Sequence, residues 1–333
     1  MTLLLIVGSI LAAIVPMFTF LSVVWWLDRY DREPVGLLVL TFAWGAVPAV
    51  LLTLPSSAVL SELLLTLGLS TGIDPTLTAS IAGPVLVAPL IEEPAKALIL
   101  LFVMLNRNFD NMTDGFVYGA AAGLGFGMSE NLLYFVAATD NPTVWGATVL
   151  IRTFYSAVMH ATATSIIGAA LGFGRFKSPL TLLASLFVGY ALAIGVHVLW
   201  NGLIVSAEVI DVPTLFVTNL ALFPLEFLLV FVVFQICLYS ESTVITHELG
   251  EEARLGTLPD NHPRRLASWW SRLFRGWMPQ GIDRNAYVRL ATRLAFRRNQ
   301  LKQLGRRATR SHEEEVDRLR IAVRTLLTSG HST

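Results

Sequence analysis

The feature that most constrains this fold is a series of seven long apolar blocks. They occupy about residues 2–27, 35–54, 78–105, 115–138, 144–173, 179–206 and 214–240. A helix needs about 20 predominantly apolar residues to cross the ~30 Å hydrocarbon core of a bilayer. Lipid offers no hydrogen bonds to an open backbone, so such blocks form helices there. We therefore predict an all-α, polytopic membrane helix bundle of about seven transmembrane helices.

Composition supports a membrane protein and excludes a typical soluble one. Of the 333 residues, 54% are hydrophobic and 14% are charged, whereas soluble domains carry about 25% charged residues. The first block has no basic leader and no small-residue cleavage site, so we expect a retained span rather than a removed signal peptide. The single cysteine, Cys237, excludes an intramolecular disulfide.

Basic residues between the blocks indicate the orientation. They occur in alternate loops, at Arg29, Arg32, Arg107, Arg175 and Lys177. The intervening loops, 55–77, 139–143 and 207–213, contain no lysine or arginine. Because basic residues accumulate on the cytoplasmic side of membrane proteins, we expect a multi-pass protein of the cell membrane. Its N-terminus would lie outside and its C-terminal tail in the cytoplasm.

Charge also divides the chain into two predicted domains. Residues 1–240 carry 7 basic and 14 acidic residues, whereas residues 241–333 carry 17 and 10. We expect a transmembrane domain, residues 1–240, followed by a basic cytoplasmic tail, residues 241–333, with helices at 284–307 and 313–327. A basic amphipathic helix can lie on anionic lipid, but a solvated charged tail fits the same pattern. Both interpretations stay open.

Polar residues inside the apolar blocks carry the functional signal. At the centre of a span an ionisable residue costs roughly 2.5 to 3.5 kcal/mol, so its presence indicates function by default. The residues concerned are Glu92, Glu93, Lys96, Glu130, Asn131, Arg152, His160, His197, Asn201 and Glu226. Four of these, each on a different predicted span, lie about 20 to 27 Å above the cytoplasmic edge. The four are Glu92, Glu130, His160 and His197, and we expect them to share one polar chamber.

Spacing along each helix suggests partners for these residues. Lys96 follows Glu92 by four residues and Glu93 by three, so it can pair with either carboxylate and leave the other free. Each histidine has a polar companion one turn further on, Asn201 for His197 and Thr164 for His160. Histidines with carboxylates are the usual ligands of catalytic zinc, which takes three protein groups and a water.

Net charge is consistent with a metal ion in the chamber. Four glutamates face one lysine and one arginine inside the predicted spans, which leaves two negative charges. A divalent cation would neutralise them, although protonation of the carboxylates would do so as well. We expect Arg152 to act as a counter-charge rather than in chemistry. Glu226 fits a structural role equally well.

The small residues of "YGAAAGLGFGMSEN", 118–131, do not resemble a phosphate-binding loop, because no Gly-Lys-Ser/Thr follows them. Gly119, Gly123 and Gly127 instead repeat every four residues, which lets membrane helices approach closely. We expect the lipid bilayer as a partner and no nucleic acid, and the repeat of small residues would bring Glu130 near the neighbouring helices.

Three other interpretations use the same polar residues. The charges could form an ion pair that only joins helices, and each histidine taken singly could be a hydrogen-bonded packing residue. The cluster could also bind protons or cations in a transporter or channel. Transporters often contain two repeated halves, and we find no such duplication here. A catalytically silent scaffold is the third possibility.

Several motifs together resemble the PrsW family of intramembrane proteases. The resemblance covers about residues 20–205, and its motifs are "DRYDREP" after the first block, "EEPAK" at 92–96, "DGFVYGAAAGLGFGMSENLLY" at 114–134, the His160 segment and "HVLWN" at 197–201. The motif order is also similar to that of the wider superfamily of CAAX prenyl proteases and bacteriocin-immunity membrane proteases. There the second motif ends in histidine, whereas Glu130 stands here. That difference leaves open a metal enzyme or one activated by glutamate alone.

The resemblance implies cleavage of a single-pass membrane protein near the bilayer, and one family member acts on an anti-sigma factor. We expect Glu93 or Glu92 to be the general base that activates a water. Lys96 would hold the other glutamate, and Asn201 would donate to the oxyanion. The expected ligands of a zinc ion, or groups that orient the water, are Glu130, His160 and His197.

Overall fold

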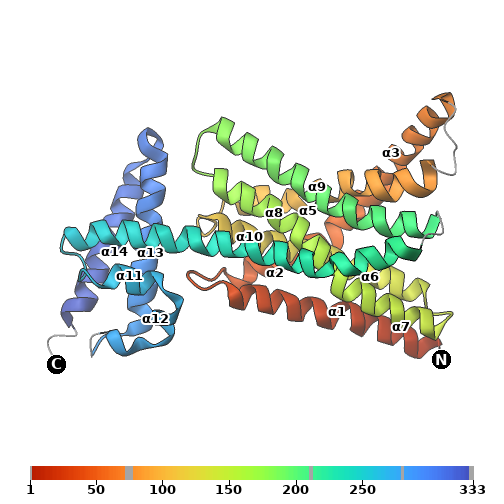
Figure 1. The fold of residues 1–333 in the computed structure, drawn as a ribbon. Coiled ribbons are helices and arrows are strands. Elements are labelled where there is room, and N and C mark those ends of the chain that lie inside the picture. The colour runs from red at the N-terminus through yellow and green to blue at the C-terminus, as the bar shows by residue number, and fades with distance from the viewer. Residues whose placement is uncertain (1, 72–77, 210–212, 279–280, 330–333) are drawn as a thin grey trace.

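The computed structural model of this protein describes residues 2–71, 78–209, 213–278 and 281–329. Within these residues the chain is helical and contains no strand. A long helical bundle carries a second group of helices, formed by the C-terminal residues, at one end (Figure 1). The predicted all-α membrane bundle is confirmed.

The first part of the chain forms the bundle. Its segments are α1 (Thr2–Leu27), α2 (Val35–Trp44), the π-helical turn η1 (Gly45–Ala49), α3 (Val50–Thr71), the π-helical segment η2 (Thr78–Val87), α5 (Ala88–Val103), α6 (Met112–Ala137), α7 (Pro142–Ile151), the π-helical turn η3 (Arg152–Ser156), α8 (Ala157–Gly174), α9 (Pro179–Val209) and α10 (Pro213–Arg254). The C-terminal segments are α11 (His262–Ala267), α12 (Trp269–Leu273), η4 (Arg275–Trp277), α13 (Arg284–Leu304), η5 (Gly305–Arg307) and α14 (Arg310–Ser329).

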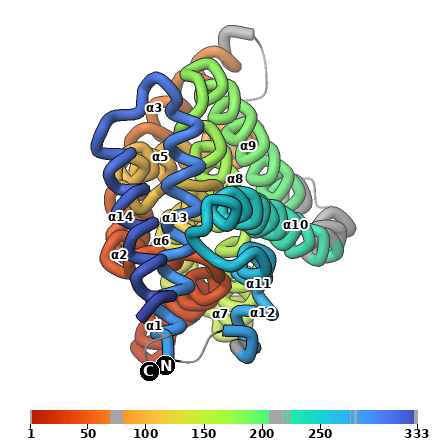
Figure 2. The backbone as a smooth tube through the Cα atoms, turned by 90° about the vertical axis from the view of Figure 1, so that its left-hand side faces the viewer, coloured from red at the N-terminus to blue at the C-terminus, as the bar shows by residue number. Residues whose placement is uncertain are grey.

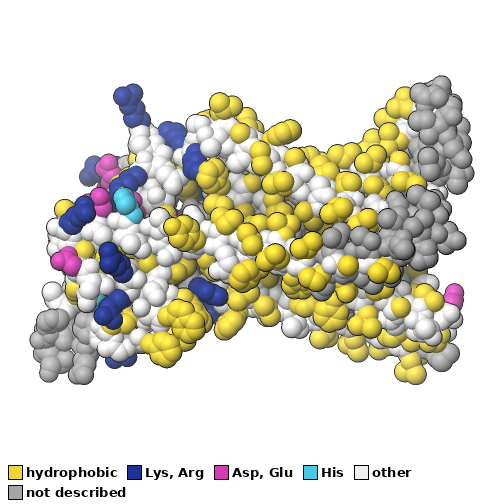
Figure 3. Space-filling model, in the orientation of Figure 1, with side chains coloured by type: hydrophobic (Ala, Val, Ile, Leu, Met, Phe, Trp, Pro, Cys, Tyr) yellow, Lys and Arg dark blue, Asp and Glu magenta, His cyan; other side chains and the backbone are white. Residues whose placement is uncertain are grey.

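Five helical segments among the described residues are long and apolar enough to cross a membrane. They are Thr2–Leu27, Val35–Gly68, Pro142–Gly174, Pro179–Val205 and Pro224–Arg254. On the face of the molecule seen in Figure 3, hydrophobic side chains are spread along the bundle, and charged side chains gather at the end formed by the C-terminal domain, residues 241–329. A multi-pass membrane protein is therefore confirmed. The two further predicted spans correspond to η2–α5 and α6, and the number seven stays a prediction.

Helix α6 lies at the centre of the bundle, in contact with α1, α2 and α8. Its first fifteen residues from Thr113 are buried almost without exception, so it packs on protein rather than on lipid and needs no apolar surface. Its glycines allow this packing. A Cβ at Gly115 would lie 1.9 Å from the carbonyl oxygen of Gly168, and one at Gly123 would lie 2.3 Å from that of His160. The predicted close approach of helices along this face is confirmed.

The C-terminal helices form a second hydrophobic core. Helix α10 runs through the predicted domain boundary at 240, and its buried residues belong to the bundle core as far as Leu238 and to the second core from Ile245. The predicted helices at 284–307 and 313–327 are confirmed as α13 and α14. The apolar face of α13 lies in the second core. Residues 284–307 therefore do not present that face to lipid, because α10 and α14 cover it.

The C-terminal domain contacts all three predicted cytoplasmic loops of the bundle. Tyr30 donates from its hydroxyl to the carbonyl oxygen of Ala267 at 2.6 Å. Arg297 donates to the carboxylate of Asp110 at 3.1 Å. Arg307 donates to the carbonyl oxygen of Phe176 at 2.7 Å. The basic loops thus lie at one end of the bundle, and α13 and α14 lie in front of α2, α5 and α6 when viewed from that end (Figure 2).

Candidate active site

Polar side chains of α5, α6, α8 and α9 meet inside the bundle. Glu93, on α5, is fully buried and accepts three hydrogen bonds. Lys96 Nζ lies 2.6 Å from its Oε1, and His197 Nδ1 lies 2.8 Å from the same oxygen. Thr164 Oγ1 donates to Oε2 at 3.2 Å. Glu93 therefore connects α5 to both α8 and α9, and it fixes the ring of His197.

His160, on α8, has a partner at each ring nitrogen. Its Nδ1 lies 2.9 Å from Lys96 Nζ, and its Nε2 lies 2.6 Å from Glu130 Oε2. An ammonium group can only donate, so Nδ1 accepts and Nε2–H donates to the carboxylate. The ring of Phe126 packs against His160 and Lys96. Its centroid lies 5.3 Å from that of the His160 ring and 4.6 Å from the Lys96 ammonium nitrogen.

Glu130, on α6, also pairs with an arginine from the π-helical turn η3. Arg152 lies 2.9 Å from Glu130 Oε2, and its Nε donates to Asn131 Oδ1 at 3.1 Å. The predicted role of Arg152 as a counter-charge is confirmed. Glu130 is nevertheless the most exposed carboxylate of the group, with 24% of its side chain accessible against 11% for Glu92. A water molecule can therefore reach it more easily.

Glu92 differs from the other two carboxylates. Its Oε2 is buried and has no hydrogen-bond partner. Lys96 Nζ and His197 Nε2 each lie 3.8 Å away, too far for a hydrogen bond. Leaving a buried carboxylate oxygen without a partner is costly. The observation indicates a site built to take a cation.

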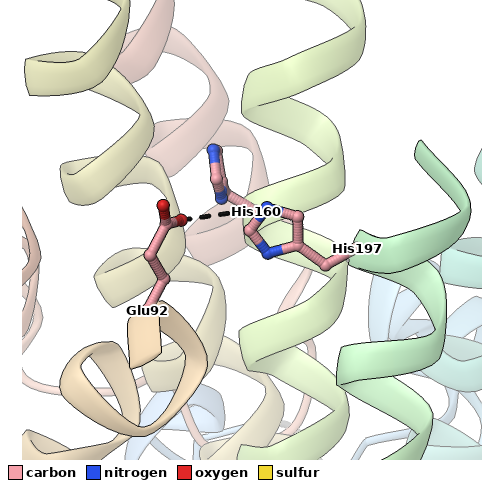
Figure 4. A group of neighbouring side chains, drawn as sticks. All are labelled: Glu92, His160 and His197. Atoms are coloured by element: carbon pink, nitrogen blue, oxygen red, sulfur yellow. Dashed lines mark ion pairs between the residues drawn. The ribbon is translucent and has the colours of Figure 1, made fainter. Parts of the chain in front are cut away.

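Glu92, His160 and His197 point toward one another from three helices (Figure 4). Each offers one ligand atom, and these atoms lie within 4.8 Å of one another. Two imidazoles and one carboxylate are a donor set that suits zinc. The unpartnered oxygen of Glu92 and this convergence together fit a divalent metal. We call Glu92, Glu93, Lys96, Glu130, His160 and His197 the intramembrane cluster.

The structure brings six of the seven predicted site residues together in this cluster. The seventh, Asn201, donates its amide to the carbonyl oxygen of Pro84 at 2.9 Å and so holds η2, the segment that leads into α5. Its role as an oxyanion donor stays a prediction. The hydrogen bond from Thr164 to Glu93 was not predicted from the sequence. The spacing placed Thr164 one turn beyond His160 on the same helix face, but it did not indicate which side chain Thr164 contacts.

A second buried polar group lies outside the membrane spans, in the loops beside the C-terminal domain. Glu33 accepts a hydrogen bond from the hydroxyl of Tyr118. Burial raises the pKa of Glu33 to about 7. Burial also raises the pKa of Asp110 to about 6, and Arg297 opposes that rise. Sequence reasoning used Glu33 only as part of a motif, because its burial depends on the packing of α6.

Comparison with known sequences places this site in a family. The PrsW family of intramembrane metalloproteases matches residues 33–235, which include the whole intramembrane cluster. No solved structure shows a significant match.

Curated relatives give the same result. A protein named Protease PrsW from Clostridioides difficile (strain 630) is 32% identical over 132 residues, 39% of this chain and 52% of the relative. Proteins of that name from Geobacillus kaustophilus (strain HTA426) and Bacillus subtilis (strain 168) are 28% and 30% identical over 166 and 168 residues. Each of these two matches covers 50% of this chain, and they cover 66% and 69% of the relatives. The matched region thus spans about half to two thirds of the relatives' own lengths. The chain belongs to the PrsW family of intramembrane metalloproteases.

Proposed function

We propose that this protein is an intramembrane endopeptidase that hydrolyses a peptide bond of a membrane-bound protein. The observation that carries the proposal is the convergence of Glu92, His160 and His197 within 4.8 Å inside the helix bundle. The relatives named as proteases support it. A helix-joining ion pair needs neither the buried carboxylate oxygen without a partner nor the two histidines that converge on it.

In this proposal Glu92, His160 and His197 would hold a zinc ion, while Glu93 and Glu130 orient the two histidines. His160 would bind the metal through Nδ1, which would exchange its contact with Lys96 for the ion. Carboxylates that accept from ligand histidines fix the ring orientation and raise the basicity of the ligand. Zinc supplies Lewis-acid chemistry, since it polarises a carbonyl group and makes water more acidic. This assignment replaces Glu130 by Glu92 among the ligands expected from the sequence.

We assign the remaining residues three roles: general base, counter-charge and donor to the oxyanion. Glu130 takes the proton of the attacking water, because its carboxylate is accessible and adjoins His160. This assignment replaces Glu93 or Glu92, the general bases expected from the sequence. Lys96 compensates the negative charge of Glu93, and the short contact between the two side chains holds the Glu93 carboxylate in place. Asn201 has a second amide hydrogen besides the one given to Pro84, and we propose that it donates to the developing oxyanion.

The proposed substrate is a single-pass membrane protein such as an anti-sigma factor. Its helix must unwind locally to expose a carbonyl, because a helical backbone is already hydrogen-bonded. We also propose the orientation that the basic loops indicate, with the C-terminal domain in the cytoplasm.

Cleavage in a purified system tests the function. The protein is reconstituted in liposomes with a candidate single-pass substrate, and wild type is compared with Glu93→Gln and His160→Ala. Glu62→Gln is the matched control, since Glu62 is an exposed acid on α3. We expect cleavage by wild type and the control and none by the two cluster variants. Full cleavage by both cluster variants would rule out this active site. Ion flux without cleavage would favour a transporter.

A further inference from the structure

The C-terminal domain exposes one concentrated group of hydrophobic side chains. In the described part of residues 241–329, the exposed large hydrophobics are Leu255, Trp270, Leu273, Phe274 and Ile321. Three of these five lie within five residues of one another, in α12 and the residue after it. We call residues 268–274, "SWWSRLF", the aromatic segment. A soluble surface rarely keeps such a group exposed without a binding partner.

The three exposed side chains share one face. Ser268 caps α12 by accepting from the backbone N–H of Ser271 at 3.3 Å. Trp270 and Phe274 are four residues apart, and their rings stack with centroids 6.3 Å apart. Leu273 is three residues from Trp270, which places it beside that tryptophan. The segment therefore presents a compact apolar patch.

The opposite face of the segment is fixed, so the patch cannot rotate into the domain core. Arg272 donates to the carbonyl oxygens of Leu266 at 2.5 Å and of Tyr30 at 3.2 Å. It also donates to the hydroxyl of Thr292 at 2.7 Å, which ties the segment to α13. These contacts join the aromatic segment to both the C-terminal domain and the loop after α1.

The aromatic segment contacts the loop that follows α1, at the end of the bundle. That helix ends at Leu27, and the exposed Trp26 is its last residue but one. The guanidinium of Arg29 lies 4.7 Å over the ring of Trp269. In the space-filling view, hydrophobic side chains at the lower edge of the C-terminal domain approach the hydrophobic surface of the bundle (Figure 3). The surface that faces hydrocarbon thus continues onto α12.

Charge and residue type both match the boundary of a membrane. Tryptophan is enriched at the level of lipid headgroups, where its ring is half in an apolar environment. Arg32, in the loop after α1, and Arg264 and Arg265, in α11 directly before the aromatic segment, are exposed. Of the acids in the loop after α1, Asp28 and Glu33 are buried, and Asp31 lies 3.8 Å from Arg293. The surroundings therefore complement an anionic headgroup.

We propose that the aromatic segment is an interfacial anchor that inserts Trp270, Leu273 and Phe274 among anionic lipid headgroups beside the end of α1. The anchor supplies a lipid contact that α13 cannot make, because the apolar face of α13 is buried. It holds the C-terminal domain against the membrane independently of catalysis.

Fluorescence quenching tests the anchor in the whole protein. The only cysteine, Cys237, is replaced by alanine, and an environment-sensitive dye is attached at Phe274→Cys. The matched control is Ile321→Cys, an exposed hydrophobic position of the same domain on α14. Both proteins are placed in nanodiscs that contain one chain each, and their elution profile confirms folding. Lipids with brominated chains quench a dye that lies among them, and iodide quenches a dye in water.

We expect brominated lipid to reduce emission at 274 and not at 321, and iodide to do the reverse. The difference should be larger in phosphatidylglycerol than in phosphatidylcholine nanodiscs. Trp270→Glu in the Phe274→Cys background should remove the lipid quenching. Iodide quenching at 274 equal to that at 321, without quenching by lipid, would overturn the anchor. Equal quenching in the two lipids would overturn its preference for anionic headgroups.

Discussion

Two buried carboxylates, Glu92 of the bundle and Glu252 of the C-terminal domain, differ in their hydrogen-bond partners. In the C-terminal domain, both carboxylate oxygens of Glu252 accept hydrogen bonds. Arg298 and Arg320 donate to Oε1, and Arg320 and Thr257 donate to Oε2. In the intramembrane cluster, three carboxylates face one lysine and one arginine, and Glu92 keeps a buried oxygen without a partner.

The difference separates a structural role from a functional one. A buried charge that has all its partners stabilises one arrangement of helices, whereas a half-satisfied polar network is costly. A chain keeps such a network where something else completes it. Two histidines stand beside the free oxygen of Glu92, whereas arginines and a threonine surround Glu252. The following predictions test this contrast.

Loss of the proposed general base should have the largest effect. Glu130→Gln should lower the cleavage rate by roughly 10²- to 10⁴-fold, the usual contribution of acid–base catalysis. Its amide oxygen can still accept from His160, so the protein should fold. Rates are measured on reconstituted protein and compared with those of Glu62→Gln. A wild-type rate for Glu130→Gln would remove this residue from the chemistry.

The same substitution at the paired carboxylate should change stability instead. Glu252→Gln removes the buried carboxylate that Arg298 and Arg320 share, while Glu248 and Glu251 still pair with Arg298 and Asp317 still pairs with Arg320. We expect a loss of about 2 to 3 kcal/mol, below the roughly 3 to 5 kcal/mol of a fully buried pair because Arg320 is partly exposed. Thermal unfolding in nanodiscs gives the stability, and cleavage per folded molecule should stay at the wild-type value. Loss of cleavage in fully folded protein would contradict a purely structural role.

Close packing of α6 against α8 positions His160 and can be tested without touching a charge. A Cβ at Gly123 would press on the backbone of His160, so Gly123→Ala should destabilise the bundle by about 1 to 3 kcal/mol and slow cleavage. The control is Gly195→Ala, because a Cβ at Gly195 would meet nothing within 4 Å. That variant should shift the midpoint of thermal unfolding little. Equal behaviour of the two variants would argue against the tight helix contact.

The smallest expected effect is a dependence of stability on pH. The pKa of Glu33 rises from 4.5 to about 7 on folding because the side chain is buried. The folded state therefore binds the proton more tightly, and stability should fall as the pH rises from about 4.5 to about 7. Glu33→Gln should make the stability less dependent on pH over this range, because an amide does not titrate. Thermal unfolding at a series of pH values measures it, and an unchanged slope would assign the dependence to other groups.

Much of the fold and the membership of the site could be predicted from the sequence. Apolar blocks of bilayer length predicted the helices. The similar depth of Glu92, Glu130, His160 and His197 predicted that they meet, because helix rise is constant. The small residues at every fourth position of α6 predicted its close contact with α8.

The finer assignments needed tertiary geometry. Spacing allows Lys96 to reach either glutamate, and only the packing of α5 against α8 and α9 sets its distance at 2.6 Å from Glu93 and 3.8 Å from Glu92. The amphipathic pattern of α13 likewise suits a lipid surface or a protein core. Contacts with α10 and α14 place the apolar face of α13 in a protein core, and the local sequence pattern does not encode these contacts.

Metal content tests the central contrast most directly. Purified wild type, Glu92→Gln and Glu252→Gln are analysed for bound metals by elemental analysis at equal protein concentration. We predict about one zinc ion per chain for wild type and for Glu252→Gln, and almost none for Glu92→Gln. Equal zinc in all three proteins, or a wild type that cleaves its substrate without any divalent metal, would contradict the proposed role of the Glu92 carboxylate.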